Sequence, residues 1–272
     1  MLEYPEINTI VGQMKHELIG KTITSGVLLK KNNNLFMSES DANRYQFLAS
    51  GKVTHIEQMG VEFYIFLDNG YGILFCQSGG KILFNRSESD LPKAYNIRFD
   101  FHDGSVLTYT MQLFSLGVFV ISHQDWENRK KNCDKFDPFD ERGFDGFMNF
   151  VSELPEDEKK QIKIFLASHV QGIMSTFAAE ILLYAGIHPS IQMKKLDRTA
   201  YERIYNSMKY VLTDAINKKG RCTECDLYGI NGDYIAAAER KNIGSPCPIC
   251  GTVMEKNSVG GITAFCPDCQ KK

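Results

Sequence analysis

Cys247-Pro-Ile-Cys250 is followed, after fifteen intervening residues, by Cys266-Pro-Asp-Cys269 near the end of the chain. Two C-x-x-C pairs at this separation are typical of a four-thiolate zinc site, because each pair can wrap one flank of a tetrahedral ion. The segment between them is long enough for two short strands and a turn, with Gly260-Gly261 as the natural tip. Four unrelated buried or disulfide-bonded cysteines are the alternative. The spacing favours one structural Zn²⁺ ion, with Cys247, Cys250, Cys266 and Cys269 as its ligands.

The composition is that of a globular protein. The chain has 272 residues, of which 43% are hydrophobic and 24% charged, enough for two domains with separate cores. Its first residues lack the basic and apolar regions of a signal peptide, and no apolar run reaches membrane-spanning length. We therefore expect no membrane partner and a cytoplasmic location, nucleoid-associated in a bacterium. In that reducing compartment the eight cysteines are interpreted as thiols and metal ligands.

Charge is distributed unevenly along the chain. Residues 191–272 carry 13 Lys and Arg against 9 Asp and Glu, a net charge of +4, whereas the whole chain has a net charge of −2. A polyanionic partner would therefore contact a local patch. An ordinary solvated surface is the alternative interpretation. The candidate phosphate-contacting residues are Lys194, Lys195, Lys218, Lys219, Arg221, Arg240, Lys241 and Lys256.

The first half of the chain changes from a helical to a strand pattern. Apolar residues from Ile7 to Ile19 follow a helical period, which Gly20 ends. From there to about Ser122, short apolar runs separated by turn signals predict a β-sandwich or barrel. Asp68-Asn69-Gly70 and His102-Asp103-Gly104 are hairpin signals, because Asn and Gly accept positive φ angles. The predicted strands are Val53–Ile56, Val61–Leu67, Ile73–Cys76, Ile82–Phe84, Ile97–Phe101, Val106–Met111 and Val118–Ile121.

The second half is predicted to be helical. Residues 123–140 are polar and contain Pro138, which is typical of a linker. Helical patterns follow at about 142–153, 157–169, 174–186 and 197–217. The prediction is an α+β protein. Its parts are an N-terminal helix plus β-sandwich domain (1–122), a linker (123–140), a helical domain (141–240) and a zinc hairpin (241–272).

Three stretches carry a resemblance to a known family. They are Glu3-Tyr4-Pro5-Glu6, then Ala179-Glu180 through Ala185-Gly186-Ile187-His188-Pro189, and Gly244-Ser245-Pro246 leading into the first cysteine pair. With the order of parts, they resemble the formamidopyrimidine-DNA glycosylase and endonuclease VIII family over essentially the whole chain. The resemblance implies an N-terminal helix, a β-sandwich, a helix-two-turns-helix domain and a C-terminal zinc ribbon.

The start of the chain departs from the family pattern. In the family the initial Met is removed, the exposed Pro amine attacks the sugar C1′, and the next Glu protonates the opening deoxyribose. Here Leu2 stands at the Pro position, and a bulky second residue should leave Met1 in place. One residue of extended chain is about 3.5 Å, and misplacing a nucleophile by about 1 Å can cost about a hundredfold in rate. The resemblance implies Glu3, Glu6 and Met1 as catalytic candidates, with weak lyase chemistry.

Other family positions differ as well. The assisting Lys of the sandwich corresponds to Val61, and the zinc-hairpin Arg to Gly261. The Asn that holds a DNA phosphate corresponds to Ser175, which can still donate one hydrogen bond. Residues 111–115 replace the Asp-Pro-Arg-Arg-Phe loop that fills the gap left by a flipped base. Met111, Leu113, Phe114 and Leu116 could supply an apolar wedge instead, although packing in the core of the last strands is the favoured interpretation.

Two further features have structural interpretations. Cys222-Thr-Glu-Cys225 could bind metal with Cys76 or Cys133, form a reversible disulfide, or accelerate thiol exchange. Two reduced thiols are favoured, since the other pairs already supply four zinc ligands. His188, in a Gly-Ile-His-Pro turn, is interpreted as a structural hydrogen-bonding residue.

The resemblance implies a monomeric base-excision-repair protein of the DNA glycosylase type. It would bind damaged double-stranded DNA, flip a nucleotide and hydrolyse the N-glycosidic bond, with Glu3 as the main acid–base residue and little or no AP lyase activity. A catalytically inactive protein that recognises DNA lesions or structures is the alternative. A scaffold that now binds RNA or a protein is a third hypothesis.

Overall fold

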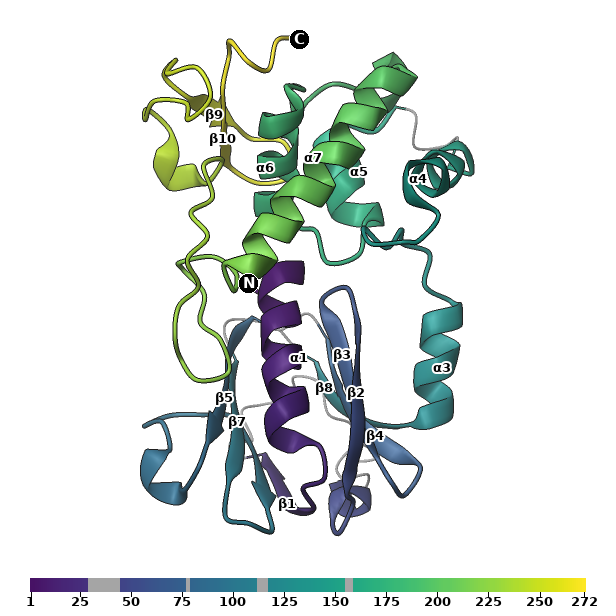
Figure 1. Cartoon of the computed structure of the whole chain (residues 1–272), viewed down its shortest axis with the longest axis vertical. Coiled ribbons are helices and arrows are strands. Elements are labelled where there is room, and N and C mark those ends of the chain that lie inside the picture. The colour runs from purple at the N-terminus through teal and green to yellow at the C-terminus, as the bar shows by residue number, and fades with distance from the viewer. Residues whose placement is uncertain (29–44, 77–78, 112–116, 155–158) are drawn as a thin grey trace. The chain divides into compact units, whose positions relative to one another are not determined.

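The computed structural model describes residues 1–28, 45–76, 79–111, 117–154 and 159–272 (Figure 1). These residues form two compact units. The first consists of Met1–Cys133 with Lys219–Asp233, and the second of Asp134–Lys218 with Tyr234–Lys272. Among these residues, no helix combines the length and apolar character that crossing a membrane requires.

The first unit is a β-sandwich with the N-terminal helix α1 (Tyr4–Leu18) beside it (Figure 1). Its two antiparallel four-stranded sheets have the orders β1-β6-β7-β5 and β2-β3-β4-β8. Buried side chains of α1 and of both sheets form one apolar core, which confirms the predicted helix and sandwich. The strands are β1 (Ile23–Leu28), β2 (Val53–Met59), β3 (Glu62–Leu67), β4 (Tyr71–Phe75), β5 (Gly80–Asn85), β6 (Ile97–Phe101), β7 (Val106–Met111) and β8 (Val118–Ser122), with 3-10 helices η1 (Tyr45–Leu48) and η2 (Glu88–Asp90).

Both predicted hairpin turns are present. Gly70 connects β3 to β4 and Gly104 connects β6 to β7, with φ angles of 87° and 83°. These left-handed angles are accessible to glycine at little cost. Strand β1 was not among the predicted strands, because its sequence Ile-Thr-Ser-Gly-Val-Leu contains a glycine and little alternation.

Residues 123–131 of the predicted linker form helix α3 (His123–Lys131), and the boundary between the two units, after Cys133, falls within the predicted range 123–140. Ser122 and Asp125 close a capping box at its start. Trp126 is fully buried, stacks on Tyr64 at 5.3 Å between ring centroids, and donates a 2.8 Å hydrogen bond to Glu57. Polar residues surround the single large apolar side chain of Trp126. The segment therefore has the composition of a linker, although Trp126 packs the helix against the sheet.

The second unit contains the helices and the cysteine hairpin. A large apolar cluster joins the helices, and a smaller one joins α6 to the hairpin through Ala179, Leu183, Cys247, Met254, Ala264 and Cys266. The four predicted helices and the antiparallel hairpin are thus confirmed. The elements are α4 (Gly143–Ser152), α5 (Ile162–His169), α6 (Ser175–Ala185), η4 (Met193–Lys195), α7 (Arg198–Asn217), η5 (Arg240–Asn242), β9 (Glu255–Asn257) and β10 (Thr263–Phe265).

Residues 219–233, predicted to lie in the helical domain 141–240, pack in the first unit instead. Leu227 is fully buried in the sandwich core, and its carbonyl accepts a 2.9 Å hydrogen bond from Phe84 N. The amide of Leu227 donates to Gln13 of α1, which in turn donates to Asp226 at 2.7 Å. We call residues 219–233 the return loop.

Candidate active site and zinc centre

Two candidate catalytic carboxylates lie at the start of α1. Glu3 is the N-cap residue and Glu6 the third helical residue, and together they form a capping box. Glu6 Oε2 accepts a 2.7 Å hydrogen bond from Glu3 N. The box satisfies helical N–H groups, and the helix dipole favours negative charge at this end. Both residues are almost fully buried, with exposed fractions of 2% and 3%.

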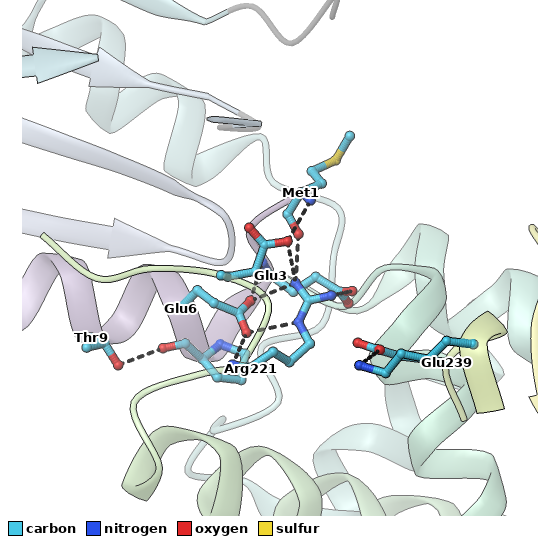
Figure 2. Close-up of polar contacts among 9 residues, drawn as sticks. Met1, Glu3, Glu6, Thr9, Arg221 and Glu239 are labelled. Carbon is cyan, nitrogen blue, oxygen red and sulfur yellow. Dashed lines mark hydrogen bonds and ion pairs between the residues drawn. The ribbon is translucent and has the colours of Figure 1, made fainter. Parts of the chain in front are cut away.

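Arg221 of the return loop lies against these carboxylates (Figure 2). Its Nε is 3.0 Å from Glu6 Oε1 and its second terminal nitrogen 3.1 Å from Glu6 Oε2, while Nη1 faces Glu3 Oε1 at 3.6 Å. The backbone N–H of Arg221 also donates to Glu6, at 2.9 Å. Burial lowers the pKa of Arg221, but the carboxylates of Glu6 and Glu3 outweigh it and raise the pKa above its ordinary value.

Gly220 allows the return loop to approach α1 this closely. Its φ angle is 89°, and a Cβ added there would lie 2.8 Å from Glu6 Cγ. A side chain at this position would be strained by its backbone and would also displace Glu6. Only glycine fits at position 220. The close approach that it allows places the guanidinium of Arg221 against the carboxylates.

The side chains of the first two residues lie in different environments. Leu2 is 1% exposed and belongs to the sandwich core, whereas Met1 is half-exposed. The Met1 amine lies 3.1 Å from Glu224 Oε1, and the Met1 carbonyl accepts a 2.7 Å hydrogen bond from Arg221. The three catalytic candidates thus meet at one place, together with two return-loop residues that the sequence analysis did not connect with them.

The predicted phosphate-contacting residues do not form one set. Lys219 and Arg221 belong to the first unit and the other six to the second. The prediction is wrong for Arg221, which is 5% exposed and engaged by carboxylates. The remaining seven are exposed. Lys218 and Lys241 pair with Asp214 and Glu239.

Ser175 and Gly261, the two second-unit positions that differ from the family pattern, are neighbours. A Cβ added at Gly261 would lie 2.9 Å from Ser175 Oγ, and the φ angle of Gly261 is 103°. The hairpin tip is fixed by Lys163, whose buried Nζ donates to Gly261 O at 3.0 Å and Thr263 Oγ1 at 2.8 Å. Lys163 was not among the residues predicted from the sequence. Its signal was a lysine within the otherwise apolar run from Ile162 to Leu166.

Two other positions that differ from the family pattern, Val61 and Met111, pack against the core of the first unit, so core packing is the correct interpretation of Met111. Leu113, Phe114 and Leu116 lie outside the described residues. His188 agrees with its structural interpretation: Nδ1 accepts a 3.1 Å hydrogen bond from Ser190 N, and burial lowers the pKa of the ring.

The four hairpin cysteines have the geometry of a zinc site. Their sulfurs all lie within 4.8 Å of one another, with 4.0 Å between Cys247 and Cys269 and 3.4 Å between Cys250 and Cys266. Zn–S bonds of about 2.3 Å would separate tetrahedral sulfurs by about 3.8 Å. Ile249 N lies 3.4 Å from the sulfur of Cys247, and Cys269 N lies 3.4 Å from the sulfur of Cys266. The cluster is consistent with one structural zinc ion.

The other four cysteines are not disulfide-bonded. Cys222 and Cys225 are half-buried in the return loop. That they are two reduced thiols stays a prediction. Burial and Glu62 raise the pKa of Cys76 to about 12, which makes it a poor nucleophile at neutral pH.

Known proteins are similar to this chain over nearly its whole length. Residues 1–112 match the family model for the formamidopyrimidine-DNA glycosylase N-terminal domain. The formamidopyrimidine-DNA glycosylase of Bacillus cereus is 26% identical over 100% of both chains, and that of Ureaplasma parvum 29% identical over 99% of this chain and 100% of its own. Among solved structures, Lactococcus lactis Fpg (MutM) in complex with DNA containing N7-benzyl-Fapy-dG has a TM-score of 0.84 and 21% identity, covering 99% of this chain and 100% of that one. The complex of Lactococcus lactis Fpg with DNA containing an abasic site has a TM-score of 0.83, with the same identity and coverage. The likeness to these structures is one of fold.

Proposed function

We propose that this chain is a divergent member of the formamidopyrimidine-DNA glycosylase family and a base-excision-repair protein that binds damaged double-stranded DNA, flips a nucleotide and hydrolyses its N-glycosidic bond. The observation that carries the proposal is the Glu3–Glu6 pair at the start of α1, in the domain that matches the family model. Glu3 is the acid–base residue of the proposed reaction, and general acid–base catalysis typically contributes about 10²–10⁴ in rate.

Little or no lyase activity is part of the proposal. A lyase step needs an unengaged amine that can attack the sugar C1′. Leu2 cannot supply this amine, because its nitrogen is the amide of the peptide bond to Met1. The Met1 amine is held by Glu224, so an attack on the sugar would first break this ion pair. Hydrolysis by water requires neither change.

Glu3→Gln is expected to abolish base release, by about 10²–10⁴ in rate, while DNA binding persists. The measurement uses labelled duplexes with an abasic site, 8-oxoguanine, formamidopyrimidine or dihydrouracil, each reaction being split between borohydride trapping and alkaline cleavage. Alkali-dependent cleavage without trapping supports a monofunctional glycosylase, whereas a trapped adduct would show that the Met1 amine acts as a lyase nucleophile. Base release that persists in Glu3→Gln would exclude Glu3 as the acid–base residue.

The exposed lysines of η4 provide a separate test of DNA binding. Replacing Lys194 and Lys195 together by alanine should weaken binding to all duplexes and reduce the slope of log K against log salt by about 2, because each phosphate contact contributes about 0.9. The matched control is the double alanine variant of Lys15 and Lys131, two exposed lysines of the first unit. A slope that both variants leave unchanged would remove these lysines from the interface.

A catalytically inactive protein that recognises DNA lesions or structures is the second candidate function. The observation that favours it is the 2% exposure of Glu3, which leaves the carboxylate in a capping box and opposite a guanidinium. In that case Glu3 and Glu6 stabilise the start of α1 and take part in no reaction. Tight binding to lesion-containing duplexes with neither base release nor trapping would favour this candidate.

A further inference from the structure

The carboxylates at the start of α1 share one guanidinium. Glu3 and Glu6 come from α1 and Glu224 from the return loop, and Arg221 faces all three, at 3.6 Å, 3.0 Å and 3.8 Å. The Met1 amine pairs with Glu224. Three carboxylates therefore surround two cations. The positive charge of Arg221 lies next to the two buried carboxylates, those of Glu3 and Glu6.

A guanidinium is a suitable group for this position. Its charge is permanent and its donors are fixed in one plane, so it holds carboxylates without giving up a proton. Arg221 donates to both oxygens of Glu6 and to the carbonyl of Met1, and the remaining terminal nitrogen faces Glu3. The carboxylate of Glu3 thus has a positive neighbour whose orientation is set by other bonds.

We infer that Arg221 is a positioning residue that keeps Glu3 in its carboxylate form, so that Glu3 acts as a base toward water and not as an acid toward the sugar. The inference rests on the proposed hydrolysis. In the step, Glu3 accepts a proton from water, the water oxygen bonds to C1′, and the N-glycosidic bond breaks with its electron pair on the base nitrogen. The departing base takes a proton from solvent, and Glu3 then returns its proton to solvent. The products are a free base and an abasic sugar.

This inference goes against the family's use of the corresponding glutamate, which protonates the opening deoxyribose after attack by an amine. The amine attack is the step that the Leu2 substitution opposes, so water replaces the amine as nucleophile. A base, and not an acid, is then what the first step requires. Arg221 and Leu2 would accordingly both favour the same monofunctional chemistry.

The test compares Arg221→Met and Arg221→Lys with the wild type in single-turnover base release between pH 5 and 9. In Arg221→Met, release should fall about a hundredfold at pH 7 and recover in part at higher pH, where the carboxylate returns. Arg221→Lys keeps the positive charge and should restore the wild-type shape of the pH profile at a lower rate. The matched control is Arg129→Met, which loses a bidentate pair with Glu62 in the same unit, at 2.5 Å and 2.6 Å, and should keep the wild-type profile.

Thermal unfolding of each variant separates stability from chemistry. An equal loss at every pH in Arg221→Met, with no rescue by lysine, would reduce Arg221 to a structural role and overturn the inference alone. If the rate of base release decreases at low pH in Arg221→Met as it does in the wild type, the inference is also overturned. No base release from any duplex by the wild type would instead overturn the proposed hydrolysis, and this inference with it.

Discussion

Removal of zinc is expected to unfold the C-terminal hairpin and to abolish DNA binding. Strands β9 and β10 contain three residues each, and an isolated two-stranded hairpin is at best marginally stable in water. Its contact with α6 runs through Cys247 and Cys266, two of the four ligands. A structural zinc ion contributes about 10–16 kcal/mol of apparent binding free energy in small zinc fingers, as much as the stability of a whole domain.

The measurement combines zinc content, thermal unfolding and binding to a lesion-containing duplex. The wild type should hold one zinc ion per chain, and Cys266→Ser should lose it together with DNA affinity. Cys222→Ser is the matched control, because Cys222 is a free thiol outside the cluster. Two zinc ions per chain would contradict the assignment, as would a Cys266→Ser protein with the zinc content and unfolding temperature of the wild type.

The features that were predictable from the sequence depend on local patterns. The cysteine spacing, the turn glycines and the helical period of α1 are each set by residues close in the chain, so the zinc hairpin and most strands could be located. Strand β1 and helix α3 could not. The first has weak strand residues and is held by pairing with β6, and the second is secured by Trp126 against a distant sheet. In both cases tertiary contacts outweigh local preference.

The candidate active site, too, could be predicted from the sequence only in part. Glu3 and Glu6 were predicted from the resemblance of the stretch Glu3-Tyr4-Pro5-Glu6 to the start of the family's chains. Their partner Arg221 is 215 residues from Glu6 along the chain, and in sequence it belongs to a basic run, Lys218-Lys219-Gly220-Arg221, that has the appearance of a solvated patch. Only the return of residues 219–233 to the first unit brings the guanidinium to the carboxylates. A contact of this kind leaves no periodic signal in a single sequence.

Replacing Glu180 by alanine should destabilise the second unit by about 3–5 kcal/mol. The carboxylate of Glu180 is fully buried and accepts hydrogen bonds from Tyr234 Oη, Ala237 N and Ala238 N, at 3.1, 3.0 and 2.7 Å. Each donor left buried and unpaired costs about 1–3 kcal/mol. Glu180→Gln preserves the shape and one acceptor, and should cost less. Thermal unfolding of the zinc-loaded protein measures both, and equal stability of the two variants would contradict a hydrogen-bonding role.

The pH dependence of the same comparison tests the protonation of Glu180. Burial raises its pKa above the ordinary value of 4.5, although the three donors act in the opposite direction. A carboxyl with a raised folded-state pKa contributes most stability below about pH 4.5, and this contribution is lost as the pH rises through the folded value. The stability advantage of the wild type over Glu180→Gln should therefore be larger at pH 5 than at pH 8, with zinc saturating at both. An advantage that grows with pH would mean that the three donors outweigh burial and that the charged form is the one the fold stabilises.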